Sequence, residues 1–170
     1  MLKFNEAEVD LQEYLRLSKD KALANANVAK AIHTKLVYQP EHKYEKWNFE
    51  VALNYINTAI EIEKQSTPNI QEAAVADSTN ENKKARYLDF MLQKSRILLS
   101  NKNFDEAIAL YYELNKGELR SPALLYASAL AHADKGDSLS VQIELLDSAI
   151  AMFGTRLPAE AASYVLHRGK

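Results

Sequence analysis

One four-residue pattern occurs three times in this 170-residue chain and limits its fold more than any other feature. In each copy a large apolar residue is followed by further residues three, seven and ten positions later. The copies are Phe49, Ala52, Ile56 and Ala59; Phe104, Ala107, Tyr111 and Leu114; and Leu139, Gln142, Leu146 and Ala149. Because these steps keep residues on one face of an α-helix, each copy predicts an amphipathic helix. Repeated helices of this kind bury their apolar faces by stacking, which predicts a helical repeat protein.

Capping and helix-breaking residues divide the chain into eight expected helices and no strand. The expected helices cover residues 6–17, 19–38, 49–65, 82–100, 104–115, 122–134, 139–153 and 158–168. Asn5 with Glu8 has the spacing of a capping box, and Ser18 is the expected cap of the second helix. Pro122 suits a first helical turn, and the apolar side of the third helix extends as far as Glu63. The sequence therefore predicts an all-α fold.

The spacing of the three copies indicates one insertion. The second and third copies start 35 residues apart, whereas the first and second start 55 residues apart. Residues 66–81 lie between the first two copies, are rich in Ser, Thr and Asn, and lack a sustained apolar stripe. We therefore expect this segment to be a flexible insertion within a single domain that covers residues 1–170.

Two of the copies resemble a known repeat. The segment NKNFDEAIALYYEL resembles the second helix of a tetratricopeptide repeat, and KGDSLSVQIELLDSAI resembles it with one residue inserted. The resemblance extends over residues 85–153 and, less closely, over 20–65. It implies an α-α superhelix of about three helical hairpins with flanking helices at both ends. In that family small residues let the two helices of a hairpin touch, and bulky residues fill the space between hairpins. By this resemblance the small positions are Ser95, Ala107 and Ala129, and the bulky positions are Tyr111 and Leu146.

The resemblance also implies a binding surface, because the first helices of such hairpins line a concave groove that holds peptides. The residues expected to face the groove are Asp89, Leu92, Arg96 and Leu99 of one hairpin, and Ala123, Tyr126, Leu130 and Asp134 of the next. The Lys and Asn residues with which some family members grip a terminal carboxylate are not reproduced. An apolar groove with Arg96 as its cation suits a helix or an extended apolar segment of a partner protein.

A second candidate surface is the aromatic turn around Tyr44 and Trp47, which holds the only tryptophan of the chain. Tryptophan and tyrosine dominate the energetics of many interfaces, so this turn is a candidate hot spot for a partner. The alternative interpretation is that Trp47 and Phe49 pack the turn onto a neighbouring helix, as aromatic residues more often do.

Composition excludes several classes of partner and location. The chain has 21 Lys and Arg against 23 Asp and Glu and no basic stripe, so we expect no nucleic-acid binding. Acids at Glu6, Glu8 and Asp10 argue against a signal peptide, and nowhere do 18 apolar residues run together, so we expect no membrane contact. The absence of cysteine fits a reducing compartment and predicts a cytoplasmic protein.

The sequence offers no catalytic motif, so we expect a binding protein and not an enzyme. The histidines are scattered along the chain, and the closest to a metal-ligand spacing is His132 with Asp134, so no metal or other cofactor is expected. There is no nucleophile elbow and no phosphate-binding glycine loop. The sequence favours an adaptor or scaffold that binds another protein or peptide. The alternative is a regulatory or sensor domain of a larger enzyme or transcription regulator.

Overall fold

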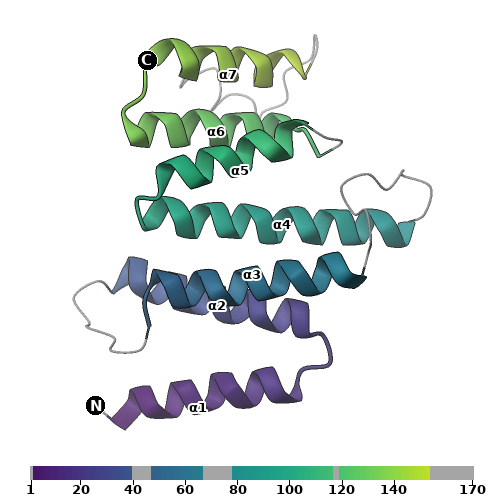
Figure 1. Cartoon of the computed structure of the whole chain (residues 1–170), viewed down its shortest axis with the longest axis vertical. Coiled ribbons are helices and arrows are strands. Elements are labelled where there is room, and N and C mark those ends of the chain that lie inside the picture. Colours follow the sequence, from purple (N-terminus) through teal and green to yellow (C-terminus); the bar gives the residue numbers. More distant parts are fainter. Residues whose placement is uncertain (1, 40–46, 67–77, 117–118, 154–170) are drawn as a thin grey trace. The chain divides into compact units, whose positions relative to one another are not determined.

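The computed structural model describes residues 2–39, 47–66, 78–116 and 119–153, and these residues form seven helices and no strand (Figure 1). The helices are α1 (Leu2–Leu17), α2 (Lys21–Tyr38), α3 (Phe49–Ser66), α4 (Ser78–Ser100), α5 (Phe104–Lys116), α6 (Pro122–Lys135) and α7 (Leu139–Ala151). The prediction of an all-α fold is confirmed. The helix expected over 158–168 lies outside the described residues.

The chain divides into two compact units, Met1–Ser100 and Asn101–Lys170. The first unit contains α1 to α4, and the second contains α5 to α7. Within each unit, helices that follow one another in the sequence pack together, as α2 does with α3, α3 with α4, α5 with α6, and α6 with α7. The expected single-domain organisation of residues 1–170 stays a prediction.

In the first unit, α2 packs closely on α3 because its buried face is made of small side chains. The buried residues of α2 are Ala22, Ala24, Ala26, Val28, Ala29 and Ile32, and those of α3 are Ala52, Ile56, Ala59, Ile60 and Glu63. Alanine allows two helix backbones to approach, while the isoleucines supply most of the apolar area removed from water. The predicted apolar side of this helix, including Glu63, is therefore confirmed.

The first unit also places α2 and α4 side by side and parallel. Three contacts join them at a constant offset of 66 or 67 residues: Asp20 with Arg86, Ala26 with Gln93, and His33 with Ser100. The middle contact is a buried hydrogen bond of 2.8 Å that Gln93 Nε2 donates to the carbonyl oxygen of Ala26. Residue numbers increase together on both helices from one contact to the next. The two helices therefore run in the same direction.

In the second unit, Pro122 begins a helix as the sequence predicts, and Ser121 and Gly136 cap its two ends. Ser121 caps α6 by accepting a hydrogen bond of 3.3 Å from the Leu124 amide, and Pro122 occupies the first turn. Gly136 ends α6 with φ of 84°, a left-handed conformation that glycine adopts without steric cost. The core between α6 and α7 is formed by Leu125, Ala129, Leu146 and Ala149.

Three predicted boundaries near the starts of helices are wrong. α1 begins at Leu2, so Asn5 and Glu8 lie inside the helix and not at its start. α2 is capped by Asp20, whose carboxylate accepts a hydrogen bond of 3.0 Å from the Leu23 amide, while the Ser18 hydroxyl donates to the Asp20 carbonyl. A carboxylate makes the stronger cap because its charge also interacts favourably with the positive end of the helix dipole.

The third wrong boundary concerns the expected insertion. Ser66 belongs to α3, and residues 78–81 belong to α4, so the ends of the predicted loop are helical. No Gly or Pro interrupts Ser78–Ser100, and polar residues such as those at 78–81 carry only small penalties of helix propensity. Residues 67–77 lie outside the described residues.

Candidate functional site

Four predicted groove residues form one exposed stripe along α4. Asp89 and Arg96 are exposed, and Leu92 and Leu99 are partly exposed. The buried residues among and around them are Phe90, Met91, Gln93, Ser95, Ile97 and Leu98. Because steps of three and four residues keep one side of a helix, the four side chains share that side. We call Asp89, Leu92, Arg96 and Leu99 the α4 stripe; the contact of this stripe with a partner stays a prediction.

Arg96 lies close to a histidine contact at the end of α2. His33 Nε2 and Ser100 Oγ share a hydrogen bond of 2.8 Å, and the His33 ring lies 6.3 Å from the ring of Phe49 at a tilt of 57°. Burial lowers the pKa of His33 below its ordinary value, and the nearby positive charge of Arg96 lowers this pKa further. His33 is therefore neutral at pH 7 and joins α2, α3 and the last residue of α4.

The second set of predicted groove residues lies on α6, and its aromatic member also packs inside its own unit. Ala123 and Asp134 are exposed, whereas Tyr126 and Leu130 are partly buried. Tyr126 packs against the core of Leu125, Ala129, Leu146 and Ala149. The α4 stripe and these α6 residues belong to different compact units, so the shared groove between them stays a prediction.

The aromatic turn is described only in part, because Tyr44 lies outside the described residues. Trp47 is partly buried just before α3, and Phe49 lies against the His33 ring. Tyr55 accepts a hydrogen bond of 3.1 Å from Gln12 of α1. These contacts favour packing as the role of Phe49 and Tyr55, while a binding role for Trp47 stays a prediction.

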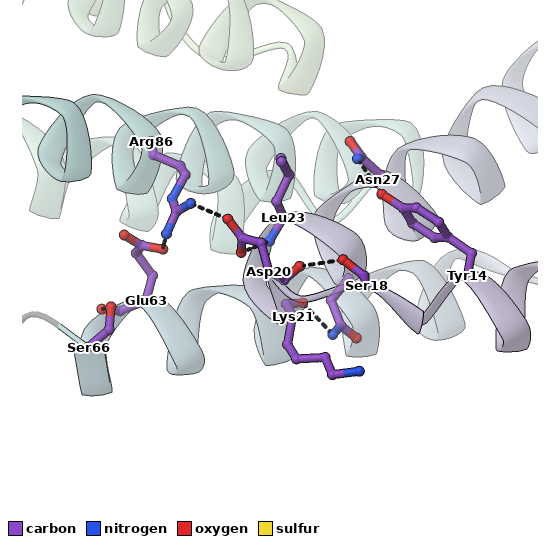
Figure 2. A network of polar contacts seen from close by, with 10 residues as sticks. Tyr14, Ser18, Asp20, Lys21, Leu23, Asn27, Glu63, Ser66 and Arg86 are labelled. Carbon is purple, nitrogen blue, oxygen red and sulfur yellow. Dashed lines mark hydrogen bonds and ion pairs between the residues drawn. The ribbon is translucent and has the colours of Figure 1, made fainter. Parts of the chain in front are cut away.

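A polar cluster that the sequence did not predict joins three helices of the first unit (Figure 2). Arg86 Nη1 lies 2.6 Å from Asp20 Oδ2, and Arg86 Nη2 lies 2.5 Å from Glu63 Oε2. Burial opposes the charge of Arg86, but hydrogen bonds and charge attraction from Glu63 and Asp20 together raise its pKa above the ordinary value. Glu63 is fully buried, so its charge needs the partner that Arg86 provides. The cluster of Asp20, Glu63 and Arg86 joins the start of α2, the end of α3 and α4.

In the second unit, His132 pairs with a different acid from the one that the spacing suggested. Its Nδ1 lies 2.6 Å from Asp137 Oδ2, whereas Asp134 is exposed. The hydrogen bond from His132 holds the pKa of Asp137 below its usual value, and Lys135 lowers this pKa further. Lys135 also pairs with Asp105 of α5 at 2.7 Å. These contacts join the end of α6 to the turn before α7 and to α5.

Searches for other kinds of site and for similar proteins give negative results. Among the residues that the structure describes, no group of three or more His, Asp and Glu side chains is placed to hold a metal ion. None of the described helices is long and apolar enough to cross a bilayer. No protein-family model, no curated protein and no solved structure matches the chain. The α4 stripe is therefore the surface on which a function can be proposed.

Proposed function

We propose that the chain is a protein-interaction module, an adaptor or scaffold, that binds a helix or extended segment of another protein along the α4 stripe. The observation that carries this proposal is the exposure of Asp89 and Arg96, with partial exposure of Leu92 and Leu99, on a helix whose other positions from Phe90 to Leu98 are mostly buried. The stripe is roughly 15 Å long at the rise of an α-helix, enough for two to three turns of a bound helix.

The chemistry of the stripe suits a protein ligand. Leu92 and Leu99 each keep part of their apolar surface in contact with water, and burying that surface would stabilise a complex. Arg96 forms no hydrogen bond or ion pair with any residue of the described ranges, so its guanidinium is free to donate hydrogen bonds or stack on an aromatic ring. Apolar contacts beside one planar cation are a common composition for an interface anchor.

The packing of the helices in the first unit resembles the stacking of tetratricopeptide repeats, and this resemblance supports the proposal. In such an array the first helices of consecutive hairpins lie side by side, and the second helix of one hairpin packs against both. Here α2 and α4 run parallel, and α3 packs against each of them. By that comparison the α4 stripe corresponds to the groove side of the array.

The full chain is first used to isolate a partner protein. The affinity of that partner for three single variants of the chain is then compared. Leu92→Ala and Arg96→Ala remove stripe side chains, and Lys35→Ala removes an exposed lysine on the side of α2 away from the contacts with α4. We expect each stripe variant to weaken binding by about tenfold, equal to about 1.4 kcal/mol, and the control to bind normally. Circular dichroism and melting curves must show that all three fold. Unchanged affinity in both stripe variants would contradict the proposal.

A further inference from the structure

Two exposed cations, Lys30 of α2 and Arg96 of α4, lie on the sides of their helices where α2 meets α4. Ala26 and His33 of α2 contact Gln93 and Ser100 of α4. Lys30 lies four residues after Ala26 and three before His33, so it is on the same side of α2 as these two contacts. Arg96 likewise lies three residues after Gln93 and four before Ser100. Both side chains are exposed, so both emerge at the junction of the two helices, between the same two contacts.

This junction lacks the acids that would balance its charge. Helix α2 contains no Asp or Glu between Lys21 and Tyr38, and α4 contains none after Asp89. Neither Lys30 nor Arg96 forms an ion pair with another residue in the ranges that the structure describes. The effect of Arg96 on the pKa of His33 shows that this positive charge acts across the junction. Two like charges on the sides of α2 and α4 that face one junction would favour a ligand that carries negative charge.

Three exposed basic side chains elsewhere in the described ranges pair with an acid on their own helix. Arg16 pairs with Glu13 at 2.6 Å, Lys64 with Glu61 at 3.2 Å, and Lys116 with Glu113 at 2.8 Å. Each of these pairs joins residues three positions apart on one helix. Lys30 and Arg96 have no acid three or four positions away on their helices, and Asp89 lies two turns before Arg96. No acid on α2 or in the second half of α4 therefore competes with an anionic ligand for these two cations.

We propose that the junction of α2 and α4 binds an acidic peptide segment, whose carboxylates pair with Lys30 and Arg96 while its apolar side chains lie against Leu92 and Leu99. This inference rests on the proposed function and names the chemistry of the partner. Two cations are too few for a nucleic acid, since such binding usually neutralises six or more phosphates. The leucines on one side and Asp89 at one end also suit a mixed acidic and apolar peptide better than a phosphate chain.

The test uses three synthetic helical peptides of equal length that share one leucine pattern and differ only in carrying Glu, Gln or Lys at the remaining positions. Binding to the full chain is measured by fluorescence anisotropy at low and high salt. We expect the Glu peptide to bind most tightly, to lose affinity as salt rises, and to shift the NMR signals of the His33 ring. The Lys peptide should bind weakest.

Three charge-reversal variants separate the junction from general electrostatics. Lys30→Glu and Arg96→Glu should each weaken binding of the Glu peptide by about tenfold. Lys35→Glu makes the same change of net charge on α2 away from the junction and should leave affinity within about twofold. Equal weakening by all three variants would overturn the junction as the site.

The outcomes distinguish this inference from the proposed function. If the Gln peptide binds as tightly as the Glu peptide, and Leu92→Ala weakens both, the interaction module stands and the acidic partner is overturned. If none of the three peptides binds the folded chain, the acidic-peptide inference is overturned. In that case the partner-binding comparison of Leu92→Ala, Arg96→Ala and Lys35→Ala still decides the proposed function on its own.

Discussion

The two sets of residues expected to line a groove, the α4 stripe and the predicted groove residues of α6, differ in which side chains a partner could contact. On α4, Arg96 is exposed and has no ion pair among the described residues. The buried side chains of this helix, such as Phe90 and Ile97, lie outside the α4 stripe. On α6, the aromatic Tyr126 packs against the core of its own unit. The same repeat register therefore yields one surface with an unpaired cation and another whose largest side chain already contributes to stability.

The two units also differ in how their helices are joined. In the first unit, buried or partly buried polar contacts link residues 66 or 67 positions apart, including Arg86 with Asp20. In the second unit, α6 and α7 meet through an apolar cluster, His132 pairs with Asp137 five positions away, and the pair of Lys135 with Asp105 of α5 is exposed. Polar contacts between distant helices demand a defined geometry, so the first unit holds its exposed stripe on a more tightly specified frame.

The largest expected effect comes from removing the cation of the polar cluster. Arg86→Ala leaves the fully buried carboxylate of Glu63 without its partner, which should lower the free energy of unfolding by about 2 to 3 kcal/mol. This range is below that of a fully buried pair, because Arg86 is partly exposed. Urea unfolding measures the change. Arg16→Ala breaks an exposed pair and should change the free energy of unfolding far less; an equal loss in both variants would contradict a special role for the cluster.

An intermediate effect tests the difference between the two stripes directly. Tyr126→Ala should destabilise the chain by about 1 to 2 kcal/mol, because it removes a ring that packs on the core of the second unit. Arg96→Ala should change stability by less than about 0.5 kcal/mol, because its side chain is exposed. Thermal melting of the two variants under one set of conditions gives the comparison. If Arg96→Ala were the more destabilising change, Arg96 would be a packing residue and the contrast would fail.

The smallest expected effect is the pH dependence that His33 contributes. Its pKa in the folded chain is below the ordinary value, so its stabilising contribution is complete above about pH 6.5 and is lost as pH falls through the folded-state pKa. Melting temperature should therefore decrease between about pH 7 and about pH 5, and His33→Gln should reduce that decrease. Asp137, whose pKa is also lowered, loses its contribution at lower pH, below about pH 4. An identical pH profile in His33→Gln would show that His33 does not couple to folding.

The local sequence signals predicted the helices and the exposed face of α4 well. Apolar periodicity together with capping and helix-breaking residues located all seven described helices, and Pro122 marks the start of α6 as expected. The exposure of Asp89 and Arg96 follows from the same periodicity. These properties depend on residues within a few turns of one another, which is the range over which a single sequence is informative.

The contacts between distant residues could not be predicted in the same way. Nothing near Arg86 in the sequence indicates that it meets Asp20 and Glu63, because that meeting depends on how three helices stack. The only local signal was the position of Glu63 on an apolar side, where a buried charge needs a partner. Likewise, Tyr126 lies at the margin of the apolar face of α6, and periodicity alone does not decide whether such a ring packs inward.

The most direct test of the central claim is photo-crosslinking from the α4 stripe in living cells. A photoreactive amino acid at position 89 replaces an exposed residue of the stripe and leaves Leu92, Arg96 and Leu99 intact; the same amino acid at position 35 is the matched control. We expect position 89 to crosslink one defined partner protein, position 35 to give none, and Arg96→Ala to reduce the crosslink at 89. Crosslinks of equal yield at both positions, or a yield at 89 that Arg96→Ala leaves unchanged, would contradict binding along the α4 stripe.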